Sequence, residues 1–336
     1  MTTMQDVAKH AGVSVMTVSN VVNNHPHVRA ATRSKVIASI EQLGYVVNTT
    51  ARSLRQGRTG VIGLAVPEID RPYFGLMATL LIERAAHHGF ELVVEQTAAR
   101  RERELDAIAR SRLRSYDGLL LYSAQLHDDD AALLRGDYPI VVLGERSYSG
   151  PVDHVVMANE QGSALATAHL IERGCRRIAM IGGRLGEPDD IDVATLRTRG
   201  YQSALAAAGI DPDGALVRST AYTFEGGRDA AIRAVGEIPE IDGFVCTTDV
   251  VAIGVVRGLQ DIGRRVPDDA AVVGFDDVPL SAFLTPSLTS VAPDHAGMAT
   301  AAIDMLVGRI LGTRSPDDYR THTGAVQLVA RESTTR

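Results

Sequence analysis

From residue 61 onward, the chain alternates between short apolar runs and longer stretches with helical spacing. The apolar runs lie at residues 61–66, 92–94, 118–121, 140–143, 177–181, 243–246 and 271–275. The helical stretches lie between them, at residues 73–88, 103–114, 161–173, 196–208, 226–235 and 251–262. Continuous apolar runs that alternate with helices are typical of buried parallel strands. The two sets of runs predict an α/β body of two doubly wound parallel-sheet lobes, with ligands bound beyond the carboxyl ends of the strands.

The first 45 residues follow a different pattern, that of short amphipathic helices. Thr3 and Asp6 have the spacing of a capping box at a helix start, and Gly12 stands where that helix must end. Ser14 is placed to cap a second helix with valines at positions 18, 21 and 22, and residues 32–43 predict a third helix. Two short helices joined by a glycine-containing turn describe a helix-turn-helix, whose second helix enters the DNA major groove. The pattern predicts a small all-α head that reads DNA.

Residues 3–57 resemble the DNA-binding head and hinge of the lactose repressor family of bacterial transcription regulators. The resemblance rests on the run D-V-A-x-x-A-G-V-S-x-x-T-V-S-x-V-V-N and on the hinge motif A-R-S-L, both of which stand in this sequence. It implies a helix-turn-helix domain at residues 1–47, a hinge helix at 48–57 and an effector-binding and dimerisation domain at 58–336. The body would have a periplasmic-binding-protein-like fold, with lobe 1 at about 58–159 plus 293–321 and lobe 2 at about 160–292 plus 322–336.

The distribution of charge agrees with a DNA-binding head. The whole chain carries a net charge of −7, which by itself argues against a nucleic-acid partner. Residues 1–58, however, hold seven basic and two acidic side chains, a net charge of +5, so the remaining residues carry −12. A basic head on an acidic body concentrates the attraction for phosphates at one end of the chain.

The resemblance also implies which residues contact double-stranded DNA. Val15, Met16 and Asn20 are expected to face bases, whereas three small polar residues face phosphates or cap the helix: Ser14, Thr17 and Ser19. The remaining implied contacts are Asn23, Ala51 and Leu54. The hinge is too short to be stable alone and is expected to fold only on DNA, where paired Leu54 side chains would wedge into the minor groove. We therefore expect a homodimer on an inverted-repeat operator, without the leucine heptads of a tetramer.

Polar and aromatic residues that follow the predicted strands are candidates for binding a small effector. Tyr73 and Phe74 follow the first strand and could stack on a ring or pack the lobe. By resemblance, Arg197 and Asp276 match family positions that contact the ligand through hydrogen bonds, and Tyr222 falls where an aromatic stacks on it. For Asp249, which also follows a strand, contact with the ligand and capping of the next helix are equally supported.

Two departures from the family pattern leave the identity of the effector open. The common Asn-Asp pair is Thr248-Asp249 in this chain, which removes an amide that bridges sugar hydroxyls in some members. The usual Asp-Arg after the fourth apolar run is replaced by Gly144-Glu145-Arg146, so the acid has moved one position along the chain. The expected effector is a small polar metabolite, a sugar or related polyol.

Other function classes have little support in the sequence. It has no phosphate-binding glycine loop, nucleophile elbow or His/Cys cluster, so we expect no enzyme, cofactor or metal. Cys175 and Cys246 are expected to be packed thiols in a reducing compartment. No apolar leader or membrane span is visible, which predicts a cytoplasmic protein. The leading prediction is a sequence-specific transcription repressor that a small sugar-like effector releases from a palindromic operator. The alternatives are a corepressor-dependent regulator that binds a nucleobase or other metabolite and, more remotely, a metabolite-processing enzyme with a DNA-binding head.

Overall fold

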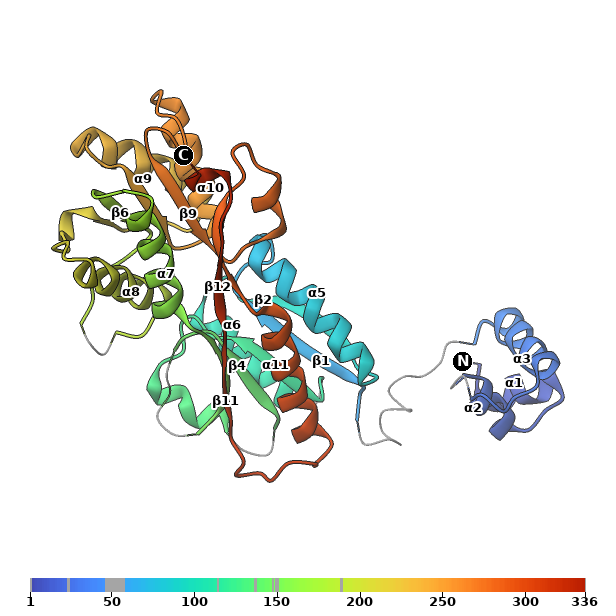
Figure 1. The fold of residues 1–336 in the computed structure, drawn as a ribbon. Helices are drawn as coiled ribbons and strands as arrows, with labels where there is room; N and C mark the ends of the chain where they lie inside the picture. Colours follow the sequence, from blue (N-terminus) through green and yellow to red (C-terminus); the bar gives the residue numbers. More distant parts are fainter. Residues whose placement is uncertain are drawn as a thin grey trace. The chain divides into compact units, whose positions relative to one another are not determined.

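The computed structural model describes residues 2–22, 25–45, 58–113, 115–135, 138–146, 148, 151–187 and 190–335. These residues form two compact units, one within residues 1–59 and the other from residue 60 to the end (Figure 1). The predicted hinge, with Ala51 and Leu54, lies outside the described residues, as does Asn23.

The head consists of three helices, α1 (Met4–Ala11), α2 (Val15–Val22) and α3 (Ala30–Leu43). The Asp6 carboxylate accepts the backbone N–H of Thr3 at 2.9 Å, and the Thr3 hydroxyl accepts the N–H of Asp6 at 3.3 Å, so the predicted capping box is present. Gly12 ends α1 with φ +62°, a conformation that favours glycine. The core of the head is built from small apolar side chains on all three helices: Val7, Ala8, Ala11, Val18, Val21 and Val36.

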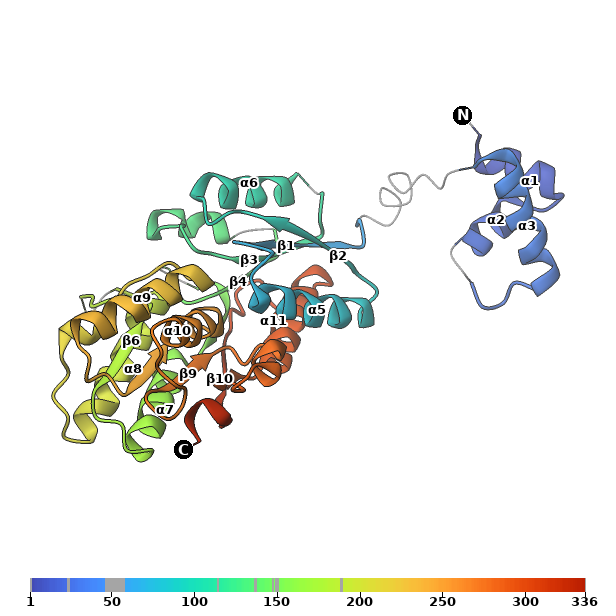
Figure 2. The same cartoon turned by 90° about the horizontal axis from the view of Figure 1, so that it is seen from above.

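The body contains two six-stranded sheets, which confirms the predicted two-lobed α/β fold (Figures 1 and 2). The first sheet has the order β11-β5-β4-β3-β1-β2 and the second β12-β10-β9-β8-β6-β7. The strands of the first sheet are β1 (Val61–Val66), β2 (Glu91–Gln96), β3 (Gly118–Tyr122), β4 (Ile140–Leu143), β5 (Asp153–Met157) and β11 (Thr321–Gly324). Those of the second are β6 (Ile178–Ile181), β7 (Val217–Arg218), β8 (Gly243–Cys246), β9 (Ala271–Phe275), β10 (Thr289–Pro293) and β12 (Val326–Val329). All described pairs are parallel except that of β12 with β10.

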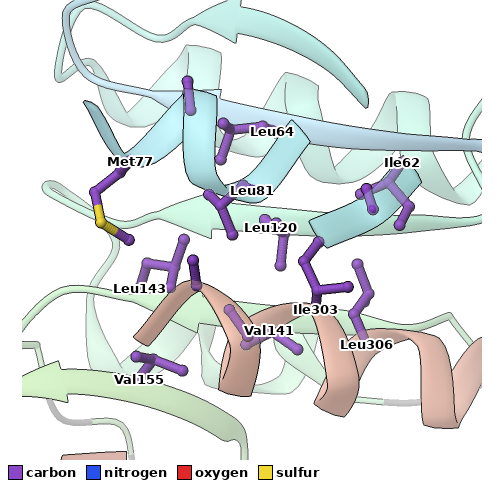
Figure 3. Packing of buried hydrophobic residues seen from close by; sticks show 14 of the residues in the cluster. Ile62, Leu64, Met77, Leu81, Leu120, Val141, Leu143, Val155, Ile303 and Leu306 are labelled. Carbon is purple, nitrogen blue, oxygen red and sulfur yellow. The ribbon is translucent and has the colours of Figure 1, made fainter. Parts of the chain in front are cut away.

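Helices cover both faces of each sheet. In the first lobe, α5 (Pro72–His87) and α11 (His295–Ile310) pack on one face, where Leu81, Leu120 and Ile303 are fully buried (Figure 3). The 3-10 helix η1 (Asp128–Leu134) and α6 (Arg101–Arg112) cover the other face. In the second lobe, α7 (Asn159–Glu172) and α8 (Val193–Ala207) lie opposite α9 (Phe224–Glu237) and α10 (Asp249–Asp261). Short 3-10 turns complete this lobe: η2 (Gly214–Leu216), η3 (Pro279–Phe283) and η4 (Glu332–Thr334).

The chain passes between the lobes three times, at Ala158, Asp294 and Ala325. The third passage comes after β11, which pairs with β5 in the first sheet, so residues 322–324 belong to lobe 1 rather than to lobe 2. The sequence pattern also left α11 and several strands unassigned, among them β5, β7, β10 and β11. Each lobe is therefore assembled from segments that lie far apart in the sequence.

Candidate functional site

Helix α2 presents apolar side chains to solvent. Met16 is 70% exposed and Val15 is 41% exposed, although both are apolar. Ser14 accepts the backbone N–H of Thr17 at 3.1 Å and so caps the helix, as predicted from its position. Half-buried Asn20 lies one turn further along α2. Exposed apolar side chains beside polar ones are typical of an interaction surface.

A shallow groove of about 490 Å³ lies beside this face of α2. Ser14, Thr17 and Asn20 line one side of it, and residues that sequence reasoning missed line the other: His27, Val28, Arg29 and Thr32. Arg29 immediately precedes α3 and adds a positive charge to the groove. Polar donors and one arginine around the start of a helix are suited to bind backbone phosphates.

A cavity of about 430 Å³ lies between the two lobes of the body. It is lined by residues at the carboxyl ends of strands in both sheets, as the doubly wound fold predicts. Lobe 1 contributes Tyr73, Phe74, Tyr122, Glu145 and Met157, among others, and lobe 2 contributes Arg197, Tyr222, Thr248 and Asp276. Five of the six predicted effector residues thus line one cavity.

Arg197 is buried in the wall of this cavity. Its position depends on Gly200, because a Cβ there would lie 2.0 Å from the carbonyl oxygen of Glu160 and would push α8 away from α7. The Arg197 guanidinium donates to the side-chain oxygen of Asn159 at 2.7 Å and to the carbonyl of Thr247. It also lies over the Phe275 ring, 3.4 Å from the ring centroid. Arg197 therefore joins helix α8, the first passage between the lobes and the end of strand β8.

The Asp276 carboxylate lies 3.6 Å from the Arg197 guanidinium. Only 6% of Asp276 is exposed, and its backbone has φ +107°, which L-residues rarely adopt. Burial raises the pKa of Asp276 to about 8, although the Arg197 charge acts in the opposite direction. Arg197 and Asp276 together place guanidinium donors and a carboxylate acceptor on one wall of the cavity.

Three aromatic rings form the opposite wall. The centroid of Tyr122 lies 5.1 Å from that of Phe74 and 6.1 Å from that of Tyr73, in edge-to-face geometry. The hydroxyls of Tyr73 and Tyr122 are 3.3 Å apart, and burial raises the pKa of both. Sequence reasoning missed Tyr122, for which the only signal is an aromatic residue at the end of an apolar strand.

Tyr222 and Arg71 meet across the cavity. The hydroxyl of Tyr222 donates to the carbonyl of Gly182 at 3.4 Å, which fixes the ring in lobe 2. The guanidinium of Arg71, from lobe 1, lies 5.9 Å from the centroid of this ring and also pairs with Glu68. Both Arg71 and Tyr222 line the cavity, so the two lobes are in contact beside it.

The structure separates Asp249 from the other effector candidates. Its carboxylate is fully buried, accepts hydrogen bonds from Val278, Ser281 and Ser290, and is absent from the cavity lining. The capping role in α10 belongs to Thr248, whose hydroxyl accepts the N–H of Val251 at 3.2 Å. Asp249 therefore has neither of the two roles expected from the sequence, contact with the ligand or capping of the next helix.

Glu145 and Thr248, the two departures from the family pattern, both line the cavity. One carboxylate oxygen of Glu145 accepts the backbone N–H of Met157 at 3.1 Å, close to the first passage between the lobes. Burial raises the pKa of Glu145, while hydrogen bonds from Met157 and Asn159 lower it. The shifted acid is therefore still within reach of a ligand.

No group of three or more His, Cys, Asp or Glu side chains among the described residues is arranged to hold a metal ion. None of the helices in this part of the chain combines the length and apolar character needed to cross a bilayer. Cys175 and Cys246 are buried thiols outside any disulfide among the described residues. The Cys175 thiol donates to the carbonyl of Asp242 at 3.3 Å, and burial raises the pKa of Cys246.

A helix-turn-helix head followed by a two-lobed body with a lined cavity defines a DNA-binding regulator that responds to a small molecule. Residues 3–48 match the family of bacterial regulatory proteins of the lacI type, and residues 167–334 match the periplasmic binding protein-like domain. The chain belongs to the lacI family of bacterial transcription regulators.

Similar proteins cover the whole chain. The ribose operon repressor of Halalkalibacterium halodurans is 32% identical over 99% of this chain and 97% of its own length. A solved complex of the transcriptional regulator CelR with cellobiose is 32% identical, with a TM-score of 0.72, and covers 99% of this chain and 100% of that one. The lac repressor dimer bound to operator and the anti-inducer ONPF is 28% identical, with a TM-score of 0.81, over 100% of this chain and 99% of that one.

Proposed function

We propose that this protein is a dimeric repressor that leaves an inverted-repeat operator when a small sugar or polyol binds between its lobes. The observation that carries the proposal is the cavity of about 430 Å³, in which Arg197 and Asp276 face a wall of aromatic rings. Arginine supplies donors and a carboxylate supplies acceptors, which together suit hydroxyls that both donate and accept. The names of a ribose operon repressor and a cellobiose complex among its relatives support a sugar-like effector.

The effector would be held by groups from both lobes. Arg197 and Asp276 form the polar clamp, and Glu145, which lines the cavity from the opposite lobe, adds an acceptor. Tyr73, Phe74, Tyr122 and Tyr222 supply apolar faces for the C–H groups of a sugar ring. We infer that the protein binds this effector without converting it and acts as a cytoplasmic regulator, an inference supported by relatives that are named as a repressor and a transcriptional regulator.

On the operator, the start of α2 would read the bases. Val15 and Met16 offer apolar contact, such as to a thymine methyl group, and Asn20 can pair with adenine. Ser14, Thr17 and Ser19 would face phosphates, together with Arg29 from the neighbouring groove. The contacts proposed for Asn23, Ala51 and Leu54 stay predictions, because these residues lie outside those that the structure describes.

The aromatic wall favours one second candidate, a corepressor with a planar base. Tyr73, Phe74 and Tyr122 line the cavity and could offer one ring face or edge to a nucleobase, and Arg197 could donate to its ring acceptors. In that case the ligand would be required for DNA binding rather than opposing it.

A two-stage experiment tests both candidates. The shift in melting temperature of the purified chain is first measured with D-ribose, cellobiose, sugar alcohols, adenine and guanine. Any compound that stabilises the chain is then added to a DNA mobility assay with a palindromic operator. Release of DNA supports the repressor with an inducer, a ligand requirement supports the corepressor, and failure of every sugar and polyol to stabilise the protein would exclude the proposed effector class. Light scattering of the same preparation should give a dimer; a stable tetramer would contradict the proposal.

A further inference from the structure

The loop after strand β9 holds two consecutive residues in unfavourable backbone conformations. Asp276 has φ +107° and Asp277 has φ +45°, although neither is glycine. Such residues persist only where the surrounding structure holds them in place. Asp276 lines the cavity, so the contacts that hold this turn decide where its carboxylate points.

Arg331 holds the turn from one side. Its guanidinium donates to a carboxylate oxygen of Asp277 at 2.6 Å and to the carbonyl of Leu288 at 2.7 Å. Arg331 follows strand β12, which pairs with β10, and neither Arg331 nor Asp277 belongs to the cavity lining. The backbone N–H of Asp276 donates to the carbonyl of Val291 at 2.9 Å and so attaches the turn to β10 as well.

Asp249 holds the turn from the other side. Its carboxylate accepts the backbone N–H of Val278 at 2.8 Å and the hydroxyls of Ser281 at 2.7 Å and Ser290 at 2.5 Å. The Ser290 hydroxyl oxygen in turn accepts the backbone N–H of Asp277 at 3.0 Å. A Cβ on Gly274 would lie 2.1 Å from the Asp249 carboxylate, so glycine at this position leaves the space that the carboxylate occupies.

We propose that Asp249 and Arg331 are positioning residues that hold the Asp276 carboxylate in the effector cavity. They act on the ligand only through the turn at residues 276–278, which they fix from two different elements. This proposal rests on the proposed function in one respect, because it takes Asp276 to be a ligand contact. It gives Asp249 a role that is neither ligand contact nor helix cap.

The first test needs no ligand. Amide hydrogen exchange of residues 275–281 is measured by mass spectrometry on the full chain and on Arg331→Gln, Arg331→Lys and Asp249→Asn. Arg314→Gln is the matched control, because Arg314 is similarly buried and pairs with Asp153 in the other lobe. We expect faster exchange in Arg331→Gln and Asp249→Asn, partial recovery in Arg331→Lys and no change in Arg314→Gln. Wild-type exchange of this segment in Arg331→Gln would overturn the proposal, even if Asp249→Asn fails to fold.

The second test is a double-mutant cycle with D-ribose and cellobiose as probes. Arg331→Gln should weaken binding about tenfold in the wild-type background and have little effect in the Asp276→Asn background, because coupled residues give non-additive losses. An equal loss in both backgrounds would show that Arg331 acts on the fold in general, and this would overturn the positioning role. If neither sugar binds the wild-type chain, the proposed effector class is in question, whereas the exchange result still decides whether the turn is held as proposed.

Discussion

The two surfaces that face ligands, the start of α2 and the wall of the cavity, differ in how their side chains are held. On α2, Val15 and Met16 extend into solvent, and the hydrogen bond between Ser14 and Thr17 is a local helix cap. In the cavity, Arg197 and Asp276 are almost fully buried, and Arg197 is bonded to residues of other elements. The head is therefore expected to accept substitutions that change its specificity without loss of stability, whereas substitutions in the cavity should change binding and stability together.

The largest effect is expected for Arg197→Ala, which tests the cavity side of this comparison. Losing a buried charge-assisted contact should cost about 2–5 kcal/mol of effector affinity. The melting temperature of the body should also fall, because Asp276 and Asn159 lose their donor. A mobility assay should show operator binding that no longer responds to the effector.

Arg199→Ala serves as the control for this prediction. Arg199 lies two residues further along α8, pairs with Glu160 and does not line the cavity, so its effector response should match that of the wild type. A wild-type response in Arg197→Ala would place this residue outside the site.

Asn20→Arg tests the head side of the comparison. Arginine pairs with guanine where asparagine prefers adenine, so the preferred half-site should shift toward G by about 1–3 kcal/mol of discrimination. The melting temperature should stay unchanged. Selection from a random operator library measures the preference, and Gln42→Arg, which adds the same charge on the exposed side of α3, should leave the preference as it is. If Asn20→Arg selects the same half-site as the wild type, Asn20 does not read a base.

A smaller effect is expected for Phe74→Leu in the aromatic wall. The substitution keeps an apolar side chain but removes the edge-to-face contacts with Tyr73 and Tyr122, each worth about 0.5–1.5 kcal/mol. The free energy of unfolding should fall by a similar amount, because these contacts are made within the protein. Effector affinity, measured by calorimetry, should fall as well, because the aromatic face proposed to pack on the sugar ring is lost. Phe224→Leu, at an exposed site outside the cavity, should bind like the wild type.

The smallest effect is a dependence of effector affinity on pH. Hydroxyl donors favour the ionised carboxylate, so a bound polyol should lower the pKa of Asp276 from about 8. Affinity should then rise by a few-fold between pH 6 and 8 and level off above pH 8. Asp276→Asn should show no such rise, and a flat wild-type profile would contradict the assignment.

The raised pKa of Asp276 also predicts how the stability of the effector-free body depends on pH. The pKa of Asp276 is about 8 in the folded chain and 3.8 in its ordinary state, so the folded state holds the proton more tightly. This group therefore stabilises the fold fully below pH 3.8, and its contribution is lost as the pH rises through 8.

Features that depend on neighbouring residues in the sequence could be predicted, whereas features that depend on contacts between distant residues could not. The head was predicted almost completely because caps, a terminal glycine and a helical period lie within a few residues of one another. Strands β5 and β11 were missed because they carry polar residues such as Asp153 and Thr321 where a buried strand would show an apolar run. For Asp249, the sequence shows an acid after a strand but not the direction of its carboxylate. Its partners Ser281 and Ser290 stand 32 and 41 positions further along the chain.

The three passages of the chain between the lobes have a consequence for the synthesis of the protein. The ribosome completes strands β1 to β5 before it begins the second lobe, yet α11 and β11 come after that lobe in the sequence. Until they emerge, the nascent first sheet lacks one edge strand and the helix that covers Ile62, Leu120 and Val141. Exposed apolar surface and an unpaired strand edge are the features that attract chaperones and drive aggregation. The first lobe to be translated is therefore among the last parts of the molecule to become complete.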